Sequence, residues 1–412
     1  MAYFFNAMCI SVQAPFYPHE AELKGATTTQ YSFVFSVFEL TVFLVGNLFG
    51  QLVNKIGVKY MNNAGSFTVS MCCIIFGFLN RINGTAIFLS FSFLIRIVEA
   101  MGNSAFMTSA FSIIAQEFPL NVGFAFAIVE TFFGIGLIAG PAVGGALYEL
   151  GGFTLPFITL GLLLCTASVS VWYFLPEEEI GNRSTTEKSS VFVLLKRPRI
   201  FLAACTTAAA SISVSFLQAT LEPHIRPMNL TPLQIGLVFV SNGLTHAIAG
   251  PICGYSCDKG FPERAASTIG ALIVVVSFLM IGPCPLLPIE NSLPLCIAAL
   301  SIHGLGFGVE LVATFSGAQK EAIISGLPDD ISTYGLVSGL WTTSFALGAF
   351  VGPSIAGVLF DTVGFAWGAT LVACLHLLVA VITMFCCFFC KTKPIMHDSE
   401  SIYILADSKE LH

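Results

Sequence analysis

The sequence predicts an all-α membrane protein whose twelve transmembrane helices form two pseudo-symmetric six-helix halves. Hydrophobic residues make up 55% of the chain and charged residues 10%, whereas soluble domains carry about 25% charged residues. Apolar runs of about 17–25 residues, the length that crosses a bilayer, recur along the whole chain. A motif near the middle of the chain returns near its end. A separation close to half the chain length indicates two related halves.

The predicted spans divide evenly between an N-terminal half at residues 1–175 and a C-terminal half at residues 199–390. A charged cytoplasmic linker at 176–198 joins the halves, and a polar tail at 391–412 is expected to be disordered. The spans are expected at residues 1–17, 30–52, 61–80, 86–109, 122–147, 153–175, 199–220, 233–254, 265–283, 294–315, 333–358 and 366–390. The first span rises only about 25 Å against a hydrocarbon core of about 30 Å, so we expect an N-terminally shortened helix.

The repeat is carried by two stretches, Gly140–Phe153 and Gly352–Phe365, which lie 212 residues apart. Both begin with Gly-Pro and continue through a further Gly, a Leu, an aromatic residue and an acid to a closing Gly-Phe. A second set of matches lies 204 residues apart and pairs Gly50, Asn54 and Lys55 with Gly254, Asp258 and Lys259. Small residues at such spacing let helices pack backbone to backbone, so we expect these surfaces to slide in a moving bundle.

The distribution of basic residues predicts the orientation of the chain. Thirteen of the 17 Lys and Arg residues fall on one side of the predicted membrane, and Lys24, Arg81 and Arg226 fall on the other. Arg96 lies within a span. Because basic residues concentrate on the cytoplasmic side, both termini are expected in the cytoplasm.

Acidic residues at membrane depth are the main candidates for a functional site. Glu39, Glu130 and Glu310 fall inside spans 2, 5 and 10, and Glu222 falls at the exoplasmic mouth of span 7. A charge at bilayer depth costs several kcal/mol, so each acid needs a partner or a wet cavity. The sequence offers them only Arg96 as a fixed cation, and Glu99, three residues away on the same helical face, is expected to pair with it. The central cavity is therefore predicted to be anionic, with protons or a cationic solute as counter-charge.

Three further side chains are candidate contacts of the same cavity. His303 shares a face of span 10 with Glu310, either as a buried core histidine or as a proton relay. Tyr334 and Trp341 share a face of span 11, either as packing residues or as a cation–π wall for the solute.

Several of these motifs resemble those of the major facilitator superfamily. The segment Gly50–Lys59 resembles its loop between the second and third helices, with Lys55 and Gly57 in place and Asn54 where the family usually has Asp. Asp258 keeps that acid in the second half. The resemblance implies that Asp258 caps a neighbouring helix and pairs with an Arg as a cytoplasmic latch, while Asn54 keeps only the cap.

Motifs later in the chain resemble those of one branch of this superfamily. The spacing Arg96, Ala100, Gly102 resembles the superfamily's fourth-helix motif. Gly140-Pro141 with Gly145, repeated as Gly352-Pro353, resembles the fifth-helix motif of exchangers that move drugs and amines against protons. The chain looks most like the vesicular polyamine transporter branch of the vesicular amine transporters on Ala14–Pro18, Glu39, Glu130–Phe132, Glu222-Pro223 and Gly335–Leu340.

The resemblance implies a secondary active transporter that exchanges protons for an organic cation, a polyamine such as spermine or spermidine, by alternating access into acidic vesicles. Two alternatives remain open: a broad drug/proton antiporter of the plasma membrane or lysosome, and a non-transporting receptor. The expected location is a secretory, synaptic-type or endolysosomal vesicle membrane.

No enzyme motif, cofactor site, metal site or nucleic-acid site is predicted, since the chain has no phosphate loop, HExxH or Gly-x-Ser-x-Gly elbow. We expect a monomer, with a dileucine-like segment Glu400–Leu405 as a candidate contact for a sorting adaptor. Asn83 and Asn229 are glycosylation sequons in exoplasmic loops too close to the membrane for use to be predicted.

Overall fold

The computed structural model describes residues 1–117, 122–174, 194–285, 290–327 and 331–389. Within these helices, the side chains of residues 47, 51, 54, 115–116, 122–127, 130, 331–332, 334 and 387–389 lie outside the description.

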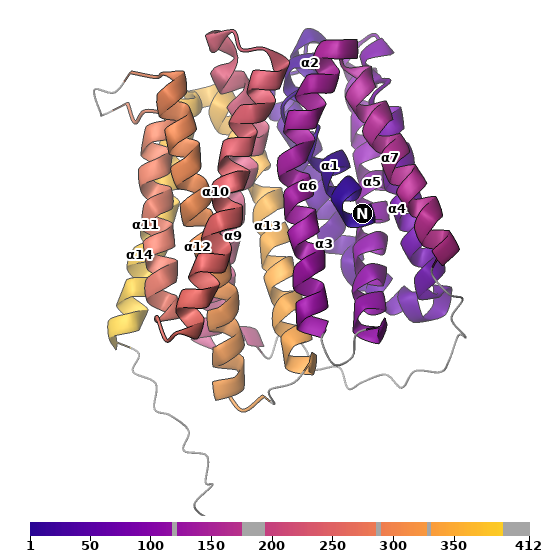
Figure 1. Cartoon of the computed structure of the whole chain (residues 1–412). Helices are drawn as coiled ribbons and strands as arrows, with labels where there is room; N and C mark the ends of the chain where they lie inside the picture. Colours follow the sequence, from indigo (N-terminus) through magenta and orange to yellow (C-terminus); the bar gives the residue numbers. More distant parts are fainter. Residues whose placement is uncertain (118–121, 175–193, 286–289, 328–330, 390–412) are drawn as a thin grey trace, which may run out of the picture.

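The described chain consists of helices and the turns between them, as predicted, in two groups that stand side by side (Figure 1). The N-terminal group contains α1 (Ala2–Ser11), α2 (Tyr17–Leu23), α3 (Thr28–Ile56), α4 (Val58–Phe76), α5 (Thr85–Glu117), α6 (Val122–Gly151) and α7 (Thr154–Phe174). The C-terminal group contains α9 (Pro198–Ile225), α10 (Pro232–Asp258), α11 (Glu263–Ile281), α12 (Leu293–Ile324), α13 (Ile331–Val363) and α14 (Phe365–Phe389). Short 3₁₀ turns occupy Leu79–Arg81 and Arg226–Met228. Eleven of the described helices are long and apolar enough to cross a membrane.

The first predicted span differs from the structure. Instead of one helix over residues 1–17, the chain forms the ten-residue helix α1, a turn, and the separate helix α2. Pro15 has no N–H to donate, which favours a break at this point, and Pro18 sits in the first turn of α2, where a missing N–H costs nothing. α1 therefore begins at about mid-height of the bundle (Figure 1).

The two halves repeat the same helix contacts, which explains the sequence repeat. A methyl group added to Gly140 on α6 would meet Ser11 Oγ and lie 3.0 Å from the Met8 carbonyl oxygen of α1. One added to Gly352 on α13 would meet Ser215 Oγ and lie 2.9 Å from the Ile212 carbonyl oxygen of α9. The motif therefore marks a close backbone contact in each half, confirming the pseudo-symmetric fold.

The halves meet at one end of the bundle, which we call the α2 end because α2 lies there (Figure 1). The last third of α6 packs on the start of α10, where a Cβ on Gly145 would lie 2.8 Å from Leu233 Cα. The last third of α13 packs on the start of α3, where a Cβ on Gly357 would lie 2.7 Å from Thr29 Cα. Contact this close between helices of different halves holds the α2 end shut.

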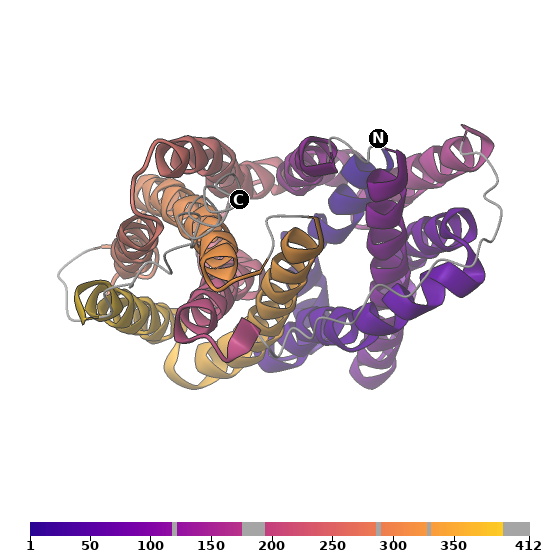
Figure 2. The ribbon, with the colours of Figure 1, turned by 90° about the horizontal axis from the view of Figure 1, so that it is seen from below.

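The opposite end, seen in Figure 2, lacks such contacts in the described residues. A Cβ added to Gly50 of α3, Gly134 of α6 or Gly339 of α13 would meet nothing within 4 Å. The described ion pairs near this end stay within one half: Glu321 of α12 lies 3.1 Å from Arg199 of α9. Among the described residues, the close glycine contacts between the halves therefore lie toward the α2 end.

Candidate functional site

The N-terminal half contains a buried ion pair at mid-membrane. Arg96 Nη1 lies 2.9 Å from Glu99 Oε2, as the three-residue spacing predicts, and the two residues are 3% and 0% exposed. Gln13 Nε2 donates to Glu99 Oε2 at 3.2 Å, and the Arg96 guanidinium lies 4.1 Å from the centre of the Phe38 ring. The ion pair is therefore supported by one hydrogen bond to Glu99 and by one aromatic ring beside Arg96.

Glu39 lies near the same pair on α3 but has a different environment. Its side chain is partly exposed, and it forms no hydrogen bond or ion pair with any described residue. Arg96 acts on it electrostatically, yet that guanidinium is already hydrogen-bonded to Glu99. Glu39 is thus a half-buried residue at membrane depth whose carboxyl group forms no hydrogen bond or ion pair with the described residues.

The C-terminal half has histidines in place of a fixed cation. His303 is fully buried, with Nε2 3.0 Å from Ser213 Oγ and Nδ1 in contact with the Asn242 amide. Ser213 Oγ itself donates to the Ala210 carbonyl at 2.7 Å, so it accepts from His303 Nε2–H, and Nδ1 accepts from Asn242. Both ring nitrogens are therefore satisfied in the neutral imidazole, the arrangement of a core histidine.

Glu310 and His376 form the second buried charged group of this half. Glu310 Oε2 lies 3.4 Å from His376 Nδ1, and both side chains are completely buried. His376 Nε2 lies 3.1 Å from the Ala209 carbonyl oxygen of α9. Neither oxygen of Glu310 has a hydrogen-bond partner among the described residues. The pair joins α12 to α14 and α9 inside the half.

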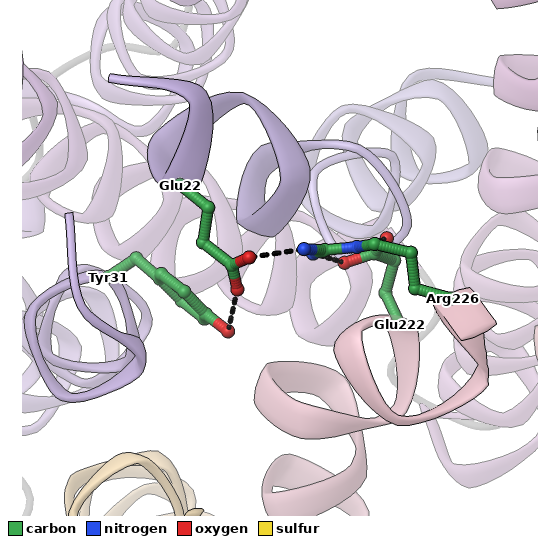
Figure 3. Close-up of polar contacts among 4 residues, drawn as sticks. All are labelled: Glu22, Tyr31, Glu222 and Arg226. Carbon is green, nitrogen blue, oxygen red and sulfur yellow. Dashed lines mark hydrogen bonds and ion pairs between the residues drawn. The ribbon is translucent and has the colours of Figure 1, made fainter. Parts of the chain in front are cut away.

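A third charged group bridges the halves at the α2 end (Figure 3). Arg226 donates to Glu222 through Nε at 3.0 Å and Nη2 at 2.6 Å, one helical turn earlier on the same chain segment. Its Nη1 contacts Glu22 of α2, which also accepts from the Tyr31 hydroxyl at 3.1 Å. The guanidinium therefore links Glu222 of the C-terminal half to Glu22 of the N-terminal half.

This bridge corrects one expectation. The sequence predicts Arg96 as the only fixed cation available to the membrane acids and places Arg226 among the loop charges. Arg226 follows Glu222 by four residues, which places the two side chains on the same face of the helix end. Glu222 is 2% exposed and already paired in this conformation.

Other predicted site residues are placed more simply. Trp341 packs against Phe345, with ring centres 5.7 Å apart, and its Nε1–H has no partner among the described residues. Gly57 ends α3 at φ +92°, a conformation that favours glycine, and Lys55 is exposed.

Asp258 makes no hydrogen bond or ion pair with a described residue, so the expected Arg latch is not formed in this conformation. The side chains of Asn54, Glu130 and Tyr334, and the tail segment Glu400–Leu405, lie outside the described residues.

Sequence reasoning missed three members of these groups: Gln13, Glu22 and His376. Gln13 lies 86 residues from Glu99, and His376 lies 66 residues from Glu310, so no local spacing reveals either partner. A signal was present for His376, because an ionisable residue in the middle of an apolar span is by itself a candidate.

Known proteins are similar to this chain in sequence and in fold. The profile of the family described as Major Facilitator Superfamily matches residues 1–327 and 206–402. The MFS-type transporter SLC18B1 of Homo sapiens is 36% identical over 368 residues, covering 89% of this chain and 80% of that protein. The synaptic vesicular amine transporter of Homo sapiens is 26% identical, covering 88% of this chain and 67% of that protein.

Two solved structures share the fold. A bacterial homologue of the human lysosomal transporter Spinster, in an inward-facing and occupied conformation, superposes with a TM-score of 0.74 at 14% identity, covering 93% of this chain and 94% of that one. The nucleoside transporter NupG superposes with a TM-score of 0.68 at 12% identity, covering 93% of this chain and 96% of that one.

Proposed function

The chain belongs to the Major Facilitator Superfamily and is a multi-pass membrane transporter rather than an enzyme; from this premise we propose that it exchanges protons for an organic cation by alternating access. The observation that carries the proposal is the state of Glu39. A carboxyl group at membrane depth, without a hydrogen bond or ion pair among the described residues, needs either a proton or a cation. The two therefore compete for one group, which is the condition for exchange.

The proton has a second candidate position in the Glu310–His376 pair. A carbonyl oxygen can only accept, so His376 Nε2 carries a hydrogen toward Ala209, and the lone pair or hydrogen on Nδ1 faces Glu310. With no proton between them, a bare carboxylate would face an imidazole lone pair in a dry interior, which is costly. We therefore propose this pair as a second position that a proton can occupy during the cycle.

The direction of transport follows from the charge distribution. Lys24, Arg81 and Arg226 lie toward the α2 end. Of the thirteen other basic residues outside the predicted spans, the eight that the structure describes lie toward the opposite end, and five fall outside the described residues. The positive-inside rule then makes the α2 end exoplasmic and the opposite end cytoplasmic. In the cytoplasm-open conformation the transporter binds its cation, and in the exoplasm-open conformation it releases that cation in exchange for protons.

The substrate class is an organic amine, in keeping with the vesicular amine transporters among its relatives. Glu39 lies within α3 and the predicted site residue Glu130 within α6, two separate helices of the N-terminal half that each pack on the C-terminal half, α3 on α13 and α6 on α10. Carboxyl groups separated in this way suit a linear polyamine with several ammonium groups better than a single charge. We propose a vesicle membrane with an acidic interior as the location, with both termini in the cytoplasm.

Transport by the purified protein in proteoliposomes with an acidic interior tests this function. We expect uptake of radiolabelled spermidine to stop in Glu39→Gln and Glu130→Gln, because Gln keeps the shape but neither ionises nor takes up a proton. Glu290→Gln is the matched control, since Glu290 is exposed in a loop and makes no bond with a described residue. Near-normal uptake by Glu39→Gln would remove that residue from the mechanism.

A substrate panel in the same vesicles separates the polyamine from other classes. Competition by spermine supports the polyamine, and stronger competition by bulky aromatic cations supports a drug/proton antiporter. Uptake that never exceeds that of empty vesicles, whatever the cation, would contradict transport and support a receptor.

A further inference from the structure

The acid of the repeated motif makes the same contact in both halves, and each contact crosses to the other half. Glu149 Oε1, at the end of α6, accepts from the Leu233 backbone N–H of α10 at 3.1 Å. Asp361 Oδ2, at the end of α13, accepts from the Thr29 N–H of α3 at 2.8 Å and from its hydroxyl at 2.6 Å. The acids are 212 residues apart and the donors 204 apart, so these are equivalent contacts with the halves exchanged.

The backbone N–H groups that donate to these acids have no hydrogen-bond partner within their own helices. The N-cap residue of each helix, Thr27 or Thr231, accepts from the N–H three residues later, and the glutamine at that position bonds back to the cap. These capping boxes satisfy the N-cap and third-position donors and leave the second-position donor without a partner in its own helix. An acid from the opposite half takes that donor, at the positive end of the helix dipole.

Glycine in the same motif makes the approach possible. Gly145 lies one turn before Glu149, and Gly357 lies one turn before Asp361. A Cβ at either glycine would come within 2.8 Å of the helix that receives the acid. The Gly-x-x-x-acid spacing therefore brings the two helix backbones together. It also places a carboxylate beside the N–H groups at the N-terminus of the facing helix.

We infer that Glu149 and Asp361 are positioning residues of the transport cycle: a pair of equivalent latches that hold the α2 end closed and must both release before it opens. The inference rests on the proposed function only for the existence of an open state at this end. The Glu22–Arg226–Glu222 bridge joins α2 to α9 and supports the closed state independently of the latches. Two equivalent latches on opposite sides of the interface resist opening evenly, as a symmetric rocking motion requires.

The test measures the closed state directly in the purified full-length protein. Spin labels on cysteines introduced at Leu23 and Glu290, exposed residues toward the α2 end of different halves, report their separation by pulsed electron resonance once reactive native cysteines have been replaced. We expect Glu149→Gln with Asp361→Asn to raise the ratio of open to closed populations roughly three- to thirtyfold, with a smaller rise for each single change.

Two controls separate latching from general loss of charge. Glu20→Gln removes a carboxylate at the same end whose partner, Lys24, lies in its own half, and it should leave the distances unchanged. Asp361→Glu keeps the charge and should restore most of the closed population. An unchanged distance distribution in the double variant would overturn the latches. This readout needs neither substrate nor a proton gradient, so it stands apart from the failure or success of the exchange assay.

Discussion

The two halves share a backbone arrangement but not their buried polar chemistry. Gly140 of α6 packs against α1 and Gly352 of α13 packs against α9, each with a serine hydroxyl and a backbone carbonyl as its nearest neighbours. At the position equivalent to Glu99, however, 204 residues on, the C-terminal half has His303. The N-terminal half holds the Arg96–Glu99 ion pair, and the C-terminal half holds His303 with both ring nitrogens hydrogen-bonded and Glu310 facing His376. The difference teaches that packing preserved the repeat while the transport chemistry was free to diverge.

The largest expected difference between the halves is in the stability lost when one buried acid in each half is replaced by glutamine. Glu99→Gln leaves Arg96 buried and without its carboxylate, and removing one partner of a buried ion pair costs about 3–5 kcal/mol. Glu310→Gln should cost less than about 1.5 kcal/mol, because a neutral amide resembles the protonated acid and donates to His376 Nδ1. Thermal unfolding of the purified variants in one detergent measures both.

Transport measurements on the Glu310→Gln variant test the same difference between the halves. With Glu310 fixed in a neutral form, we expect accumulation driven by a proton gradient to be lost while exchange of labelled for unlabelled cation continues. The double change Arg96→Leu with Glu99→Leu is the control for charge in the N-terminal half and should recover most of the stability lost in Glu99→Gln. Equal destabilisation by Glu99→Gln and Glu310→Gln would contradict the difference between the two buried pairs.

The contrast between the halves also shows what sequence alone could predict. Hydropathy, the repeat and the three-residue spacing of Arg96 and Glu99 depend on local pattern, so the fold and this ion pair were predicted from them. The partners Glu22 of Arg226 and His376 of Glu310 come from distant segments brought together by packing, which no spacing encodes. The break between α1 and α2 was missed because the apolar run continues through Pro15.

The glycine contacts give a smaller effect, expected to be alike in both halves. Gly140→Ala and Gly352→Ala each force a methyl group against a serine and a carbonyl of the neighbouring helix, and such overpacking costs about 1–3 kcal/mol. Gly339→Ala is the matched control, because its added methyl meets nothing within 4 Å and alanine favours the helix. Thermal unfolding should rank the control at or above the unchanged protein. A large loss in one half with none in the other would contradict the structural repeat.

The smallest effect separates the two acids that share Arg226. Glu22 is about one-third exposed and Glu222 is almost fully buried, although both contact the same guanidinium. Because water screens an exposed ion pair, Glu22→Gln should cost only about 0.2–1 kcal/mol. That loss should shrink further in high salt, since the Debye length falls from about 10 Å at 0.1 M to about 3 Å at 1 M. Glu222→Gln should cost more and respond less to salt, because its pair lies in the protein interior. Unfolding measured at both salt concentrations decides the point: equal salt dependence for the two variants would mean that the bridge is solvated on both sides and contributes little to closing the α2 end.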